Sequence, residues 1–276
     1  MKNIIGMFMI GATALTVSAA DPVSTNAPAA TPEVVKEEAA SPLTFGATLD
    51  VYSAYIWHGV ILNDEPVWQP DLALTYSFGD YGSVTADAWM NFDMTGNNNQ
   101  RSFGGINEID YTLQYAVTLS DLSLGIGHIW YTFPAIGDDK YYDATSEIFV
   151  SAAYNNDIVV PFIKAYYDYE QVNGTYVTVG LRKEMTFDKL TAGAEVSLGG
   201  ASQGYTSYYY DLDATGRQGN YFFTDAQALI YAKYAITANI SVGARLGWVS
   251  TMDNELKGQL HEDNLLWGGI NLGITL

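Results

Sequence analysis

The sequence predicts an all-β protein: an antiparallel up-and-down transmembrane β-barrel of about 12 strands, with short periplasmic turns and long outer loops. Three observations predict this fold. Apolar and polar residues alternate in about 12 segments. The segments have about nine to 14 residues, whereas strands of soluble proteins most often have about five or six. Short and long connections also alternate along the chain, as they do in outer-membrane barrels.

Each predicted strand separates an apolar row from a polar row. In residues 106–120, Ile109 and Tyr111 share one parity, and Glu108 and Asp110 share the other. Such a strand fits a soluble sheet as well as a barrel in lipid, so one segment leaves both alternatives open. The segments are 45–58, 67–78, 82–94, 106–120, 122–133, 146–154, 158–169, 175–186, 190–198, 221–234, 239–250 and 265–276.

Two of these segments depart from strict alternation. The seventh has apolar residues on both parities and contains Pro161. The fifth changes phase, and we expect a β-bulge at Gly125 to His128 to cause the change. The apolar residues before and after the change are Leu122, Leu124, Ile126, Ile129, Tyr131 and Phe133.

The connections favour the barrel over a β-sandwich. Tight turns such as FGDY and TFDK alternate with longer loops such as VILNDEP and TMDNELKGQLHED. A sandwich does not require this alternation, because its Greek-key links fall at either end. Aromatic residues near segment ends also fit interfacial belts, and the chain ends on Leu276, in phase with the last apolar row. The belt residues are Tyr55, Trp57 and Trp68 at one level and Phe45 and Phe78 at the other.

The N-terminal region predicts export. Residues 1–20 combine Lys2, a short apolar stretch and a small-residue cleavage site, which is typical of a signal peptide. A retained anchor helix is the alternative. Residues 21–43 are rich in Pro, Ala and Glu and are interpreted as a disordered spacer, or else a tail that docks on a partner. The barrel domain then covers residues 44–276, in the outer membrane of a Gram-negative-type bacterium.

Composition limits the partners. The chain has 31 acidic and 12 basic residues and a formal net charge of -19. This charge argues against nucleic acid, which needs basic patches, and favours small, cationic solutes beside the outer-membrane lipid. The chain has no cysteine. We expect no cofactor and no metal site, and the sequence does not define an oligomeric state.

The first hairpin reads LDVYSAYIWHGVILNDEPVWQPDLALTY. It resembles the Gcw_chp family of exported bacterial proteins of unknown function. His58 stands where the family pattern has Arg. The resemblance implies an exported protein similar to an outer-membrane barrel and implies no reaction. The matching residues are Tyr55, Trp57, Gly59, Pro66, Gln69 and Pro70, with Trp89 and Asn91 at a further site.

Charged residues gather on the polar parity and predict a negative lumen. A negative channel concentrates cations and repels anions, which favours a porin-like channel for small solutes with cation preference. The alternative is a structural or surface-interaction barrel with a closed lumen. The acids are Asp50, Asp71, Asp87, Asp93, Glu108, Asp110, Glu147, Asp168, Glu184, Glu195 and Asp225, and the bases are Lys164, Arg182, Lys233 and Arg245.

Three further features each have alternative interpretations. We expect the tryptophans of the first hairpin at the membrane interface and His58 at the lumen mouth, with a ligand role as the alternative. For the Tyr-rich loop 204–213 the alternatives are that it binds a sugar or a cationic solute, packs on itself, or folds into the barrel. The loop acids Asp138, Asp139 and Asp143 are solvated or hold a divalent ion.

Catalysis lacks support in the sequence. Its only histidines are His58, His128 and His261. Neither H-E-x-x-H nor G-x-S-x-G occurs. We therefore expect no enzyme.

Overall fold

The structure is a computed structural model that describes residues 41–95, 105–134, 143–210, 221–258, 260 and 262–276. The predicted signal peptide and nearly all of the predicted spacer lie outside these residues. Of the helices in the described part of the chain, none has the length and apolar character to cross a membrane.

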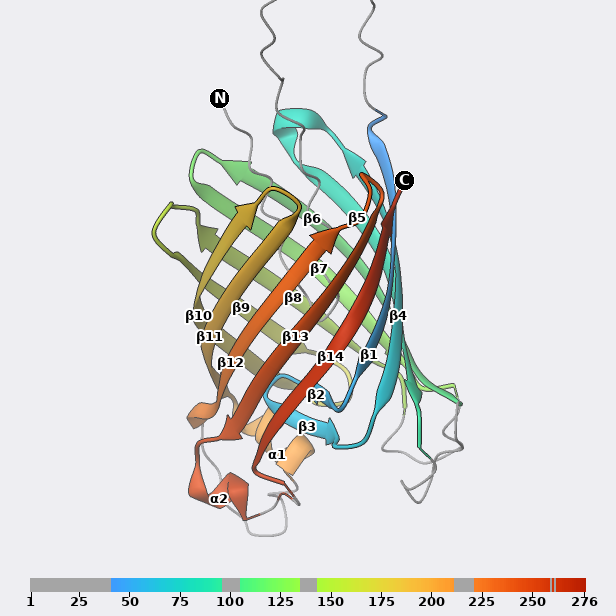
Figure 1. The fold of residues 1–276 in the computed structure, drawn as a ribbon. Coiled ribbons are helices and arrows are strands. Elements are labelled where there is room, and N and C mark those ends of the chain that lie inside the picture. Colours follow the sequence, from blue (N-terminus) through green and yellow to red (C-terminus); the bar gives the residue numbers. More distant parts are fainter. Residues whose placement is uncertain (1–40, 96–104, 135–142, 211–220, 259, 261) are drawn as a thin grey trace, which may run out of the picture.

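Twelve strands form a closed antiparallel barrel, which confirms the predicted fold (Figure 1). Consecutive strands pair throughout, except that β1 pairs with β4 because a small hairpin is inserted between them. The barrel closes where β1 pairs with β14, from Gly46 opposite Thr275 to Tyr52 opposite Gly269. The barrel strands are β1 (Leu43–Tyr52), β4 (Val67–Ser77), β5 (Ser83–Asp93), β6 (Ile106–Leu119), β7 (Leu122–Thr132), β8 (Thr145–Tyr154), β9 (Val160–Asp168), β10 (Gly174–Phe187), β11 (Leu190–Ala201), β12 (Tyr221–Ala235), β13 (Ile240–Thr251) and β14 (Asn264–Thr275).

The two ends of the barrel differ. The beginning of β1, the end of β14 and the short turns lie at one end, including η1 (Gly79–Tyr81) between β4 and β5. The other end carries α1 (Gln203–Tyr210), α2 (Asn254–Lys257) and the inserted hairpin of β2 (Tyr55–Trp57) and β3 (Val60–Asn63) (Figure 1). The alternation of short and long connections therefore places all the larger segments at one end.

The apolar rows form the outer surface of the barrel. Leu113 and Ile126 are each 57% exposed, and Val150 is 52% exposed. Polar residues of the opposite parity, such as Thr48 and Asp110, are buried inside. Because exposed apolar rows that cover a whole barrel would be costly in water, this arrangement fits an exterior in lipid.

The predicted bulge in β7 is wrong. Pairing of β7 with β6 and with β8 continues without a register shift through Gly125 to His128. The phase change has another cause: Ile129 and Tyr131 point into the barrel and are 1% and 4% exposed. They join an apolar cluster that fills the long-loop half of the interior, so apolar residues there occupy the inward parity.

The predicted interfacial position of Tyr55 and Trp57 is also wrong. β1 ends at Tyr52, and the chain turns into the barrel instead of continuing along the wall. Tyr55 is 5% exposed, and Trp57 packs on the interior clusters. Trp68, in contrast, lies on the outside, 38% exposed, with its ring 4.8 Å from that of Phe92.

Candidate functional site: the barrel lumen

The inserted β2–β3 hairpin is the main feature of the lumen. Its two-residue turn consists of His58 and Gly59, both with positive φ (45° and 78°), as a tight hairpin turn of the primed type requires. The hairpin is held at its base because the Ser53 amide donates to the Gly268 carbonyl oxygen (2.9 Å) and Ser53 Oγ accepts from the Gly268 amide (3.1 Å).

The tip of the hairpin contacts the barrel wall at β12, three strands from β1. Gly59 lies directly against the carboxylate of Asp225 on β12, where any Cβ would collide with that group. Asp225 is fully buried and accepts hydrogen bonds from Tyr176 (3.1 and 3.2 Å), Thr224 (2.9 Å) and Gln227 (2.8 Å). Glycine is therefore required at position 59 for both its backbone conformation and its lack of a side chain.

Aromatic side chains from the wall enclose the turn. The His58 ring stacks on Trp57 at a centroid distance of 4.0 Å and on Tyr176 at 4.5 Å. Helix α1 covers the same region, with Tyr205 and Tyr210 1% and 2% exposed. The cluster consists of Val60, Ile129, Tyr131, Phe149, Tyr166, Val172, Tyr176, Ala201, Tyr205, Tyr210 and Leu256. Residues 204–210 of the Tyr-rich loop thus fold into the barrel, which is one of the predicted alternatives, and residues 211–213 lie outside the described residues.

His58 is buried beside an acid. Its Nδ1 lies 4.0 Å from Oε1 of Glu147 on β8, and neither ring nitrogen has a hydrogen-bond partner among the described residues. Burial, reinforced by the positive charge of Lys164, lowers the pKa of His58 well below its usual range. The docked hairpin therefore carries a neutral imidazole.

Several predicted lumen acids are held by hydrogen bonds within the wall. Glu147 accepts from Tyr131 (2.7 Å), and Asp168 accepts from Thr145 (2.6 Å) and from backbone amides of the following loop. Asp93 accepts from Asn63 of the hairpin (2.8 Å). These carboxylates contribute to the architecture of the long-loop half of the lumen as well as to its charge.

A polar ladder crosses β4, β5 and β6. Gln69 donates to Asn91 (2.8 Å), and Asn91 donates to Asn107 (2.8 Å). Pro70 lies in β4 beside Gln69, opposite Leu49 of β1, and has no backbone N–H group to donate a hydrogen bond. Pro66 precedes β4, where its carbonyl accepts from the Met94 amide (2.9 Å). The motif residues of β4 therefore shape the strand that follows the hairpin.

A cavity of about 240 Å³ lies beside the hairpin in the lumen. The acids Asp87 and Asp110 line it from β5 and β6, and Arg182 and Arg245 line it from β10 and β13. The rest of its lining is aromatic, polar or aliphatic, with a further acid and base: Tyr52, Ala54, Tyr55, Ile56, Trp57, Gln69, Trp89, Thr112, Ile129, Lys164, Glu195, Leu229, Tyr231 and Trp267.

The structure distributes the predicted lumen residues over two regions. Asp93, Glu147, Asp168 and Asp225 lie around the hairpin and its aromatic cluster and are 2% exposed or less. The others lie along the same interior parity on the barrel wall: Asp50, Asp71, Asp87, Glu108, Asp110, Glu184, Glu195, Lys164, Arg182, Lys233 and Arg245. Their functional roles remain predictions.

The cavity also contains aromatic residues that were not predicted as lumen residues. Tyr52, Trp89 and Trp267 line it, with Tyr52 and Trp267 in edge-to-face contact at 5.7 Å. Each lies on the polar parity of its segment, for example Tyr52 with Asp50. Aromatic residues on the polar row were therefore the available signal.

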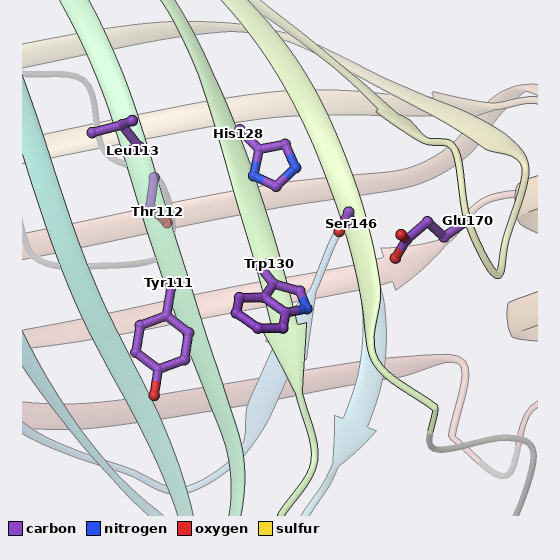
Figure 2. Close-up of a pocket in the computed structure, with 7 residues that line it drawn as sticks. All are labelled: Tyr111, Thr112, Leu113, His128, Trp130, Ser146 and Glu170. Carbon is purple, nitrogen blue, oxygen red and sulfur yellow. The ribbon is translucent and has the colours of Figure 1, made fainter.

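The outer wall has a hollow of about 470 Å³ across β6, β7 and β8 (Figure 2). His128 lies there with Tyr111, Trp130 and Ser146, and its Nε2 is 2.9 Å from the hydroxyl of Tyr169. The His128 imidazole is therefore hydrogen-bonded to Tyr169. Of the other loop residues considered above, Asp143 is exposed, whereas Asp138, Asp139, Asp211, Asp213 and His261 lie outside the described residues.

The described strands and their polar interior define a closed 12-stranded antiparallel β-barrel, the fold class of outer-membrane porins. The chain belongs to the Gcw_chp family, described as bacterial proteins of unknown function, whose family model matches residues 36–251. No curated protein matches the chain in sequence.

Solved structures that match this chain include outer-membrane channels. The COG4313 outer membrane channel from Pseudomonas putida F1 matches with a TM-score of 0.53 and 10% identity, covering 92% of this chain and 100% of that chain. The NanC porin has a TM-score of 0.48 and 11% identity over 83% of this chain and 98% of its own. The KdgM porin in complex with disordered oligogalacturonate has a TM-score of 0.47 and 10% identity, covering 84% of this chain and 98% of that chain. At this identity the likeness concerns the fold.

Proposed function

We propose that the protein is an outer-membrane channel for small solutes, with a preference for cations. The observation that carries the proposal is the closed barrel with an apolar exterior and a charged interior that contains a cavity. The β2–β3 hairpin narrows the long-loop half of this channel and limits the size of what passes.

The balance of charge supports cation preference. The predicted lumen residues contain an excess of acids over bases, and Asp87, Glu108 and Asp110 lie on two adjacent strands. Such a wall raises the local concentration of cations, and the low dielectric of the surrounding barrel strengthens its field.

Planar-bilayer recording with the purified, refolded protein tests the channel. Conductance steps are expected, and a salt gradient should give a reversal potential of the sign that cation preference requires. Combined replacement of Asp87, Glu108 and Asp110 by their amides should move this potential toward zero. A matched change outside the lumen, Asp188→Asn in the turn after β10, should leave it unaltered. An absence of conductance from folded protein would contradict the channel.

A second function rests on the inserted hairpin. If the aromatic cluster around His58 is permanently docked, the barrel is closed and its long loops serve a structural or surface-interaction role. Deletion of residues 53–66 discriminates the two. A closed barrel gains conductance only after deletion, whereas the proposed channel conducts before it and more strongly afterwards.

A further inference from the structure

The cavity beside the hairpin has an acidic and a basic side. Asp87 and Asp110 come from the adjacent strands β5 and β6, whereas Arg182 and Arg245 come from β10 and β13, neither of which neighbours β5 or β6. Lys164 of β9 adds a base to the second side, and Glu195 of β11, paired opposite Arg182, adds one acid. Acids therefore supply the charge on one side of the cavity, and three bases outnumber one acid on the other.

Groups on both sides keep hydrogen-bonding capacity. Asp110 is 6% exposed, and its Oδ1 has no hydrogen-bond partner in the part of the chain that the structure describes. A buried carboxylate oxygen without a partner is costly, so it indicates a donor that the protein itself does not supply. On the other side, neither Arg182 nor Arg245 forms a salt bridge within the described part of the chain. Arg245 instead lies over the ring of Tyr52, 5.1 Å from its centroid.

Aromatic rings flank the acidic side. Tyr55 and Trp89 line the cavity with Asp110, and their ring centroids are 5.4 Å apart. Carboxylates beside aromatic faces attract an ammonium group by charge and by cation–π interaction. Planar guanidinium groups suit a carboxylate, to which they donate two parallel hydrogen bonds.

We infer that this cavity binds a small zwitterionic solute, with its ammonium group toward Asp87 and Asp110 and its carboxylate toward Arg182 and Arg245. The inference rests on the proposed channel function and names the class of solute that the channel would select. At about 30 Å³ per water molecule in the liquid, the cavity holds about eight waters. An α-amino acid of about ten non-hydrogen atoms is of that size.

Three probes of similar shape test the inference by calorimetry on the purified full-length protein in detergent. Glutamine carries both charged groups, glutaminamide lacks the carboxylate, and glutaramate lacks the ammonium group. Glutamine should bind with about tenfold or greater advantage over each of the other two, since each loses one set of charge-assisted hydrogen bonds.

Two variants assign the ends of the solute. Asp110→Asn should weaken glutamine binding by about tenfold and leave glutaramate unchanged. Arg245→Gln should weaken glutamine binding similarly and leave glutaminamide unchanged. Lys233→Gln removes a lumen charge that does not line the cavity and serves as the matched control. Heat-modifiable gel mobility checks that each variant is folded.

Absence of saturable glutamine binding to the folded protein, or equal binding of all three probes, would overturn the inference. Conductance is recorded separately on the same preparations. Conductance without glutamine binding would reject the zwitterion site and keep the channel. Glutamine binding without conductance would reject the channel and keep the site within a closed barrel.

Discussion

Substitution of Gly59 by alanine should release the hairpin from the lumen. The φ of Gly59 is +78°, and a left-handed conformation costs a residue with a Cβ about 1–2 kcal/mol. The new Cβ would also collide with the Asp225 carboxylate. That carboxylate would have to move, although it accepts hydrogen bonds from Tyr176, Thr224 and Gln227.

The two costs add to a measurable shift. Loss of one hydrogen bond to a charged group costs about 1.5–3 kcal/mol, so the total is about 2.5–5 kcal/mol. This corresponds to an increase of about two orders of magnitude or more in the ratio of undocked to docked hairpin. Because hairpin release is a local opening, the barrel itself should keep its heat-modifiable mobility.

Limited proteolysis measures this ratio directly. When opening and closing are fast relative to cleavage, the cleavage rate follows the equilibrium population of the open form. Chymotrypsin should therefore cut after Tyr55 or Trp57 about 100-fold faster in Gly59→Ala, and larger conductance levels should accompany the cleavage.

Gly79 provides the matched control. It has a φ of +64° in the turn after β4, and no atom lies within 4 Å of the position that its Cβ would occupy. Gly79→Ala carries the same backbone cost without the collision and far from the hairpin. If Gly59→Ala and Gly79→Ala show equal cleavage and equal conductance, the proposed docking of the turn against β12 is incorrect.

Three further predictions follow from the same structure. Hairpin release should increase as the pH falls below about 6.5, because docking lowers the pKa of His58 and protonation therefore favours the undocked state. Conductance recorded as a function of pH measures this release, and His58→Gln should flatten the profile. Glu147→Gln removes the acid 4.0 Å from His58 Nδ1 with little change of size. The acid release should persist in this variant, since burial and the charge of Lys164 lower the pKa of His58; loss of the release would mean that Glu147 controls it. Leu113→Lys, on the exposed outer row, should lower the free energy of unfolding of the barrel in lipid by about 2–4 kcal/mol, whereas Gln114→Lys on the inner row should not. Equal losses of unfolding free energy, measured with urea, would mean that the rows are misassigned.

The barrel was predictable from the sequence because every wall strand has to satisfy two different solvents. Alternation over about nine or more residues is needed wherever lipid lies on one side and polar groups lie on the other. Residues 106–120 show the rule, since the outward Leu113 and the inward Asp110 belong to opposite rows. The alternating loop lengths then placed the larger segments at one end.

The hairpin was not predictable by the same rule. Tyr55 and Trp57 continue the apolar parity of β1, so alternation alone extends that strand to residue 58. An apolar side chain is equally satisfied by acyl chains and by an aromatic cluster inside the barrel. The phase change at Ile129 and Tyr131 has the same origin. The alternation of apolar and polar residues shows which side chains face an apolar environment, and it does not show whether that environment is lipid or protein.

The residues that carry the family resemblance take on a common physical role in the structure. Tyr55, Trp57 and Gly59 form the part of the chain that enters the lumen, and Gln69 anchors the strand that follows through Asn91. His58 stands where the family pattern has Arg, and Glu147 Oε1 lies near it at 4.0 Å. An arginine at this position would place a permanent positive charge beside the Glu147 carboxyl group. Histidine carries a positive charge only when it is protonated, and its burial in the docked hairpin opposes protonation. With histidine at this position, we therefore expect release of the hairpin to depend on pH.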